Sequence, residues 1–236
     1  MTHILLTGSS RGIGAAIADT LSSTSGVSIV GHGTRGSPSQ IGADLDQAGA
    51  AAALWEAALE RLDGRVDVLI NNAGVFEPNP IEADDQEWLA NWERTIRINL
   101  TAAAELSRLA VRHWQERGSE GRIVNIASRA AYRGDSPAHW HYAAAKAGMV
   151  AMTKTIARGY ASQGILAFAI CPGFTMTGMA DDYLASRGGD KLLADIPLGR
   201  VATPQEVAIA ARFLALEAPA SMTGSVIDVN GASYVR

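Results

Sequence analysis

Short apolar runs alternate with longer segments of helical periodicity along almost the whole chain. The helical patterns include residues 84–117, 141–161 and 203–216. The apolar runs between the helical patterns are HILLT, VSIVG, IGADL, VDVLI, RIVNIA, ILAFAI and SVIDV. Parallel strands need long crossover connections, and strands that are buried on both faces are continuously apolar. The pattern therefore predicts an α/β fold in which helices cover both faces of a seven-stranded parallel sheet.

The chain shows no sign of division into separate domains. It has 236 residues, of which 47% are hydrophobic, and that is enough to bury a substantial core. Composition does not shift along the chain, and no repeat of fixed period is present. We therefore expect one domain over 1–236. The longest irregular stretch includes 174–200, and a long segment of this kind predicts a substrate lid.

Charge and cysteine content narrow the classes of partner and location. The formal net charge is −4 and no long basic run occurs, which argues against nucleic acid or an anionic membrane as a partner. No stretch approaches the roughly 20 apolar residues that span a bilayer. The single cysteine, Cys171, excludes an intrachain disulfide framework, so we expect a cytoplasmic protein in which Cys171 is a buried small residue.

A glycine-rich turn, TGSSRGIG, follows the first apolar run and opens a helical segment. Gly8 permits a tight turn, Gly12 lets the backbone approach a phosphate, and Gly14 allows a helix to pack closely on the sheet. The amides at a helix N-terminus attract a pyrophosphate. This position predicts a dinucleotide-binding loop, although a glycine turn without a ligand has the same composition. A Walker-type loop is disfavoured because no Gly-Lys-Ser/Thr ends the motif.

The stretch YAAAK places a phenol and an amine one helical turn apart. Side chains at positions four apart lie on the same helix face, so Tyr142 and Lys146 are neighbours. A nearby ammonium favours the phenolate, and we expect it to lower the pKa of Tyr142 towards neutrality. Ser128 ends another apolar run, where its hydroxyl can bind a carbonyl oxygen. Taken alone, YAAAK is equally typical of a solvated helix.

Four motifs in this order resemble the short-chain dehydrogenase/reductase family, including its 3-oxoacyl-[acyl-carrier-protein] reductase-like members. They are TGxxxGxG, NNAG at 71–74, YxxxK at 142–146 and PG at 172–173, and the resemblance covers essentially the whole chain. It implies a Rossmann-type, doubly wound fold and a homotetramer or homodimer. It also implies an oxidoreductase that transfers a hydride between a nicotinamide cofactor and a small-molecule carbonyl or secondary alcohol.

The resemblance also implies a catalytic tetrad of Asn99, Ser128, Tyr142 and Lys146. In this scheme Tyr142 exchanges the proton with the substrate oxygen, and Ser128 holds that oxygen. Lys146 holds the nicotinamide ribose and keeps the pKa of the phenol low. Asn99 kinks its helix and helps to hold a water in a proton relay.

We expect NADPH rather than NADH as the cofactor. A carboxylate after the second strand would repel a 2′-phosphate, and this segment has none before Asp44, whereas Arg11 and Arg35 are suitable donors. The resemblance places Asp44 against the adenine amine. The pattern and the resemblance together assign cofactor binding to Gly8, Ser10, Arg11, Gly12, Ile13, Gly14, Thr34, Arg35, Asp44, Leu45, Asn72, Ala73, Gly74, Tyr142, Lys146, Pro172, Gly173, Thr175 and Thr177.

Two other functions remain open at this point. One is reduction of a 3-oxoacyl carrier protein, for which the arginines at 108, 112, 117 and 122 are candidate docking residues or an ordinary solvated face. Gln163 occupies the position at which we associate an arginine with docking of the carrier protein. The glutamine therefore counts against this function. The other is a nucleotide sensor of the same fold that lacks turnover. We expect no metal site, because His139 and His141 have no third ligand at a sensible spacing.

Overall fold

The computed structural model describes residues 1–176 and 193–236, and all seven predicted strands are present in it. They form one parallel sheet in the order β3-β2-β1-β4-β5-β6-β7. The order reverses between β1 and β4, which confirms the doubly wound Rossmann-type fold. The strands are β1 (Thr2–Leu6), β2 (Val27–Gly33), β3 (Gln40–Gly42), β4 (Val68–Asn71), β5 (Gly121–Ile126), β6 (Ile165–Pro172) and β7 (Val226–Val229).

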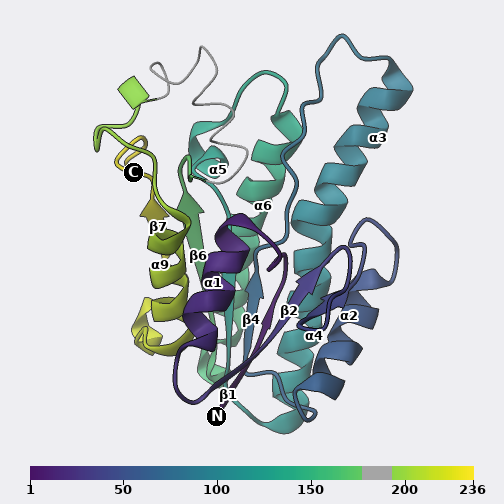
Figure 1. Cartoon of the computed structure of the whole chain (residues 1–236), viewed down its shortest axis with the longest axis vertical. Coiled ribbons are helices and arrows are strands. Elements are labelled where there is room, and N and C mark those ends of the chain that lie inside the picture. The colour runs from purple at the N-terminus through teal and green to yellow at the C-terminus, as the bar shows by residue number, and fades with distance from the viewer. Residues whose placement is uncertain (177–192) are drawn as a thin grey trace.

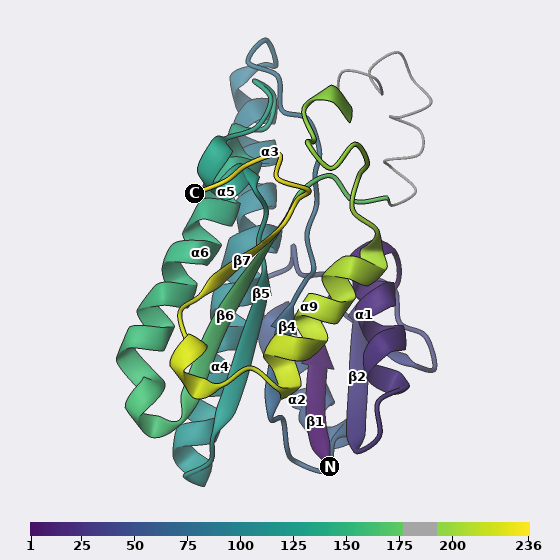
Figure 2. The same ribbon diagram turned by 90° about the vertical axis from the view of Figure 1, so that its left-hand side faces the viewer.

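Helices cover both faces of the sheet (Figure 1). Helices α1 and α9 pack against each other on one face, and α2, α4 and α6 lie on the other, as the turned view in Figure 2 shows. The described helices are α1 (Gly12–Ser22), α2 (Ala50–Arg61), α3 (Asp85–Ile96), α4 (Ala102–Arg117), α5 (Ala130–Arg133), α6 (Trp140–Tyr160) and α9 (Pro204–Leu216). None of the helices in the described ranges is long and apolar enough to cross a membrane.

The pleat of β1 divides its side chains between two cores. Ile4 and Leu6 pack with α1 and α9, whereas Leu5 packs with α2 and α4 on the other face. All three are fully buried. Successive side chains of a strand point to opposite faces, so a strand that is covered on both sides must be apolar at every position. This is the physical origin of the continuous apolar runs in the sequence.

The long helical pattern over 84–117 is interrupted in the structure. α3 is separated from α4 by a π-helical turn, Arg97–Thr101, with Asn99 in its middle. The N-terminus of α3 is capped by Asp84, whose side chain accepts from the amides of Gln86 and Glu87. π-Helical turns are rare and occur often at functional sites. The interruption fits the kink at Asn99 that the family resemblance implies.

Trp114 fixes α4 against the sheet at the end far from the π-helical turn. Its side chain is 1% exposed, and the indole nitrogen donates to the carbonyl of Val66 at 2.7 Å. The ring lies directly over Gly121 at the start of β5, where an added Cβ would stand 2.1 Å from the indole ring. Packing of this helix on the sheet therefore requires a residue without a side chain at 121.

We expect Gly121→Ala to destabilise the protein by about 1–3 kcal/mol, because the buried indole of Trp114 has no room to retreat. Urea unfolding measures the change. Gly159→Ala is the matched control: Gly159 lies within α6 with nothing within 4 Å of an added Cβ, and alanine there should stabilise the helix by ~0.5–1 kcal/mol. Equal unfolding midpoints for the two variants would contradict this account.

Candidate active site

The glycine-rich loop between β1 and α1 is held in the backbone conformation that its glycines permit. Gly8 and Gly12 have φ values of +67° and +56°, in the left-handed region that favours glycine. A Cβ at Gly14 would stand 1.9 Å from the carbonyl oxygen of Gly8. These values agree with the predicted structural roles of the two glycines. Gly8 allows the tight turn, and Gly14 allows α1 to begin in close contact with that turn.

The N-terminus of α1 suits an anionic group. The residue at its cap position, Arg11, makes no capping hydrogen bond with its side chain, and the first turn contains no acidic residue. The side chains of Ser10 and Arg11 are exposed, while Ile13 is partly buried and packs beneath them on the core. Free amides and a favourable helix dipole attract phosphate. The loop therefore fits the pyrophosphate of a dinucleotide.

The NNAG segment after β4 supports the glycine-rich loop from the side. Asn72 Nδ2 donates to the carbonyls of Thr7 and Gly8 at 3.1 and 2.9 Å, and the amide of Ala73 donates to Thr7 Oγ1 at 3.0 Å. The side chain of Asn72 is thus engaged within the protein. Gly74 is exposed at the edge of the same segment. The structure places these three predicted residues beside Gly8, with Asn72 acting on the loop itself.

His32 is a buried part of this region that the sequence prediction did not assign. It lies in β2 and is 3% exposed; Nδ1 accepts from the amide of Gly8 at 3.2 Å, and Nε2 donates to the carbonyl of Ala43 at 2.9 Å. These partners require the neutral tautomer protonated at Nε2. Burial lowers the pKa of His32, which favours the same neutral form. The sequence feature that could have indicated this role is the presence of a polar residue, His32, within an apolar strand segment.

The predicted adenosine-binding residues surround the end of β2. Thr34 and Arg35 directly follow the strand and are exposed. Asp44 is also exposed, and its Oδ1 accepts from the amide of Asp46 at 3.1 Å. The side chain of Leu45 is buried in the core beneath α2, so only its main chain can reach a ligand. These residues come from separate loops that end at one edge of the sheet.

Asn99 and Lys146 meet beneath Gly74. Asn99 is fully buried, and its amide forms two hydrogen bonds of 2.8 Å with the main chain of Val75, one through Oδ1 and one through Nδ2. A Cβ at Gly74 would stand 3.3 Å from Asn99 Oδ1 and 3.6 Å from Lys146 Nζ. The π-helical turn is therefore tied to the loop after β4. It brings the predicted Asn99 next to the predicted lysine.

Lys146 is 4% exposed, and its ammonium donates to the carbonyl of Ile126 at 2.9 Å. Its Nζ lies 5.9 Å from the ring centroid of Tyr142, so the two side chains do share one helix face. Burial lowers the pKa of Lys146 to about 8. The main chain of β5 thus holds a cation whose charge depends on pH in the physiological range.

The expected lowering of the phenol pKa is not observed. Burial instead raises the pKa of Tyr142 to about 12, and a side-chain hydrogen bond with Ser128 opposes this shift. Desolvation disfavours the phenolate, whereas the ammonium of Lys146 is directed at the carbonyl of Ile126. In the protein without ligand, Tyr142 is therefore a protonated donor at neutral pH.

Ser128 lies next to Tyr142 at the end of β5. Its residue is 9% exposed, and its Oγ also accepts from the amide of Ala130 at 3.1 Å, in the turn that starts α5. Its hydroxyl is close enough to lower the pKa of Tyr142, so two predicted catalytic hydroxyls from different elements are neighbours. Cys171 lies nearby on β6, fully buried, and burial raises the pKa of its thiol to about 11, which confirms its prediction as an inert core residue.

An aromatic wall packs beside Tyr142. The ring of Phe76 stacks on His139 with centroids 3.9 Å apart and meets Tyr142 edge-on at 4.8 Å. His139 is held in turn by a 2.6 Å hydrogen bond between Nδ1 and Ser136 Oγ. His139 is therefore held in place beside Phe76 at the edge of the candidate site. Phe76 was not predicted, and only its position two residues after NNAG pointed to it.

The end of β6 completes the edge of the site. The amide of Gly173 donates to the carbonyl of Val229 at 2.9 Å, and a Cβ at Gly173 would stand 2.8 Å from Asn230. Pro172 is the last residue of β6, and Thr175 Oγ1 donates to the carbonyl of Gly173 at 3.2 Å. The predicted Thr177 lies outside the described residues, as do residues 177–192 of the predicted lid.

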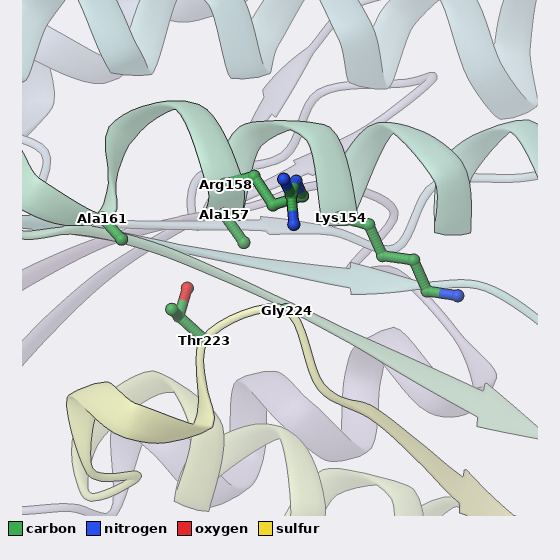
Figure 3. A pocket seen from close by; sticks show the side chains of 6 residues that line it. All are labelled: Lys154, Ala157, Arg158, Ala161, Thr223 and Gly224. Carbon is green, nitrogen blue, oxygen red and sulfur yellow. The ribbon is translucent and has the colours of Figure 1, made fainter.

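Neither a metal cluster nor a hollow helps to locate the candidate site within the described residues. Within the described part of the chain, no group of three or more His, Cys, Asp or Glu side chains could hold a metal ion. A hollow of about 580 Å³ lies at the C-terminal end of α6 instead (Figure 3), and none of its lining residues was predicted to be functional. It is lined by Lys154, Ala157, Arg158, Ala161, Thr223 and Gly224. The candidate site is therefore located by its polar and ionisable side chains, which lie at the carboxyl edge of the sheet.

Comparison with known proteins agrees with this geometry. Residues 8–232 match a family model described as enoyl-(acyl carrier protein) reductase. The chain is 36% identical to 3-oxoacyl-[acyl-carrier-protein] reductase FabG of Vibrio cholerae over 242 residues, which cover 98% of this chain and 96% of that protein. It is 35% identical to the Escherichia coli protein of the same name over 247 residues, with the same two coverages.

A further relative carries a different name. Nodulation protein G of a Rhizobium species is 36% identical over 241 residues, which cover 96% of this chain and 94% of that protein. The matches extend over nearly the full length of both partners, so the matched span contains the residues of the candidate site. The chain therefore belongs to the short-chain dehydrogenase/reductase family of NAD(P)-dependent oxidoreductases.

Proposed function

We propose that this protein is an NADPH-dependent carbonyl reductase with Tyr142 as its proton donor. The single observation that carries the proposal is the buried ammonium of Lys146 at the carboxyl edge of the sheet, which donates to the carbonyl of Ile126 and lies 5.9 Å from the ring centroid of Tyr142. A structural role alone does not account for a buried lysine, a buried amide and two hydroxyls that converge from three elements: α6, the π-helical turn and the end of β5. Such convergence is the arrangement that carbonyl chemistry requires.

The residues divide the reaction between them. When bound, the nicotinamide cofactor supplies the hydride that reduces the carbonyl carbon. Ser128 Oγ hydrogen-bonds the substrate oxygen as negative charge develops on it, and Tyr142 Oη gives that oxygen its proton. Lys146 keeps a positive charge close to the phenol that has lost its proton. Asn99 fixes the loop that carries Gly74 and so shapes the floor beneath the substrate.

The raised pKa of Tyr142 supports the reductive direction. Reduction consumes a proton that must come from a protonated donor, and a phenol with a pKa of about 12 is protonated at neutral pH. Oxidation of an alcohol would require the phenolate as base. Lys146 carries its charge below a pKa of about 8, so both groups have the protonation state needed for reduction at neutral pH.

The preference for NADPH is supported by the residues around the end of β2. Thr34 and Arg35 are exposed there, Arg11 is exposed on the neighbouring loop, and the segment between β2 and Asp44 contains no acidic residue. A guanidinium forms charge-assisted hydrogen bonds with the 2′-phosphate of NADPH. NADH has a neutral ribose hydroxyl at this position, so it cannot form such a bond. An NADPH-preferring enzyme follows from this balance of charge.

Reduction of a 3-oxoacyl carrier protein is the second candidate, because two relatives bear that name. Three of the four candidate docking arginines have contacts within the protein. Arg122 Nη1 donates to the carbonyls of Leu214 and Ala218 at the end of α9, Arg117 Nη1 donates to Gly64, and Arg112 pairs with Glu116. Gln163 forms a hydrogen bond with Gln115. These contacts favour a free small molecule over a carrier-bound substrate.

A homodimer or homotetramer completes the proposal. Ile81, Leu89 and Trp140 expose 61%, 51% and 55% of their surfaces. They surround a hollow of about 490 Å³ beside α3. In Figure 1, helix α3 extends beyond the sheet. An exposed apolar patch of this kind is typical of a subunit contact. The cytoplasmic location stays a prediction.

We expect Tyr142→Phe to lower kcat by a factor of about 100–10,000, because the substrate oxygen loses its proton donor. Cofactor affinity, measured by NADPH fluorescence, should change little, since the ring of Tyr142 still packs against Phe76. Tyr160→Phe, at the far end of the same helix, is the matched control and should keep full activity. Near-normal turnover of Tyr142→Phe would exclude the proton-donor role.

The second prediction concerns pH. Lys146 is charged below a pKa of about 8, so kcat/KM for NADPH-dependent reduction should fall roughly tenfold per pH unit above that value. Lys146→Met should show low activity without this fall, and the exposed Lys154→Met should retain it. A wild-type profile that stays flat between pH 7 and about pH 10 would show that the charge of Lys146 is not required.

The third prediction tests the cofactor. Arg35→Ala should raise KM for NADPH roughly tenfold and leave KM for NADH nearly unchanged, because only NADPH carries the 2′-phosphate. Arg61→Ala, an exposed arginine at the end of α2, is the control and should affect neither. Steady-state kinetics with both cofactors measures the ratio, and equal effects of Arg35→Ala on both would remove the argument for NADPH.

A further inference from the structure

Arg129 is a largely buried cation directly after the catalytic Ser128. Its side chain is 12% exposed, and its amide donates to the carbonyl of Pro172 at 2.9 Å. Arg129 therefore lies between the carboxyl ends of β5 and β6, where the ends of parallel strands line the ligand site. None of the steps derived above uses this guanidinium. Arginine is rarely buried without a partner.

The guanidinium of Arg129 lacks a full set of partners. Its Nη1 is buried and forms no hydrogen bond with any described residue. The nearest carboxylate oxygen, Asp195 Oδ2, lies 3.8 Å from Nη1, beyond hydrogen-bonding distance. That same oxygen is hydrogen-bonded by Nη1 of Arg133. The two arginines thus share one aspartate, and Arg133 holds it more closely.

The other surroundings of Arg129 do not neutralise it closely. Its guanidinium lies over the ring of Phe174, 4.9 Å from the centroid, which fixes the plane of the group and leaves its edges to form hydrogen bonds. Arg133 repels it, and the attraction of Asp135 is weaker than that of Asp195. A buried donor that carries charge and has no acceptor is costly, so such an atom calls for an explanation. An acceptor on a bound anion would satisfy this atom.

We propose that Arg129 binds the carboxylate of the substrate, and that the preferred substrates are short oxo acids rather than neutral ketones or acyl thioesters. This inference rests on the carbonyl reductase function proposed above. Ser128 and Arg129 are consecutive, and their Cα atoms are about 3.8 Å apart, so one side chain can hold the carbonyl oxygen while the other holds a carboxylate a few bonds away. The planar guanidinium suits bidentate binding of a carboxylate.

The test compares acids with their neutral esters. Acetoacetate and pyruvate are offered beside methyl acetoacetate and methyl pyruvate, with NADPH and purified protein. Wild-type kcat/KM should be higher for each acid than for its ester. Arg129→Met should lower kcat/KM for the acids roughly 10- to 100-fold and leave the esters unchanged, because only the acids lose a charge-assisted hydrogen bond. Arg129→Lys, which keeps the charge, should retain part of the preference.

A binding measurement separates this inference from the proposed function. Calorimetry of acetoacetate with the protein and NADP⁺, a pair that cannot react, should show binding to the wild type and its loss in Arg129→Met. Tyr142→Phe should bind acetoacetate like the wild type. Thermal melting of each variant identifies any loss of folding, and Arg129→Lys then replaces a misfolded Arg129→Met.

Each remaining outcome decides between the two proposals. Wild-type protein that reduces the esters but neither binds nor reduces the acids would overturn the role of Arg129 and leave the reductase function intact. An equal loss for acids and esters in Arg129→Met would also overturn it, because the role would then be structural. Binding of acetoacetate that depends on Arg129, without reduction of any of the four compounds, would support the carboxylate site and contradict the proposed function.

Discussion

The burial of one lysine is the constraint on which the rest of the site depends. An ammonium inside a protein needs acceptors that are already in place, and the carbonyl of Ile126 at the end of β5 is one of them. Glycine at residue 74 lies close above this cation: a Cβ there would stand at an ordinary contact distance of 3.6 Å from Lys146 Nζ and at a tighter 3.3 Å from Asn99 Oδ1. Asn99 in turn needs the π-helical turn to reach the main chain of Val75. Three elements distant in sequence are thereby set by one charge.

In the cofactor region, hydrogen bonds between neutral groups hold the glycine-rich loop in place. Thr7, Asn72 and His32 tie the glycine-rich loop to β2 and β4, and the helix that starts there has no acidic side chain at its N-terminus. A loop that is already held in place loses little entropy when it binds a ligand. Ser10, Arg11 and Arg35 lie exposed around this loop, where we propose that they contact the ligand. Residues that hydrogen-bond within the protein keep the loop rigid, and exposed residues are available for recognition of the ligand.

The electrostatics of the reacting groups differ from what proximity alone suggests. Four residues of spacing do bring Tyr142 and Lys146 onto one helix face, but desolvation acts more strongly on the phenol than the lysine does. The result is a protonated tyrosine beside a cation of lowered pKa, which suits reduction. Arg129 adds a second buried positive charge on the other side of Ser128. The site is therefore more cationic than the family motifs require, and this excess points to the substrate.

The strands and the glycine turn follow from local pattern in the sequence, because strand burial and φ > 0 each leave a periodic or compositional mark. The reversal of strand order and the catalytic tetrad were expected from the family resemblance and not from local pattern. Other features needed the tertiary structure. The partners of His32, the stacking of Phe76 on His139, the raised pKa of Tyr142 and the missing partner of Arg129 all depend on which side chains meet across loops. Desolvation and hydrogen bonding are set by these distant neighbours, and a linear sequence does not state who they are.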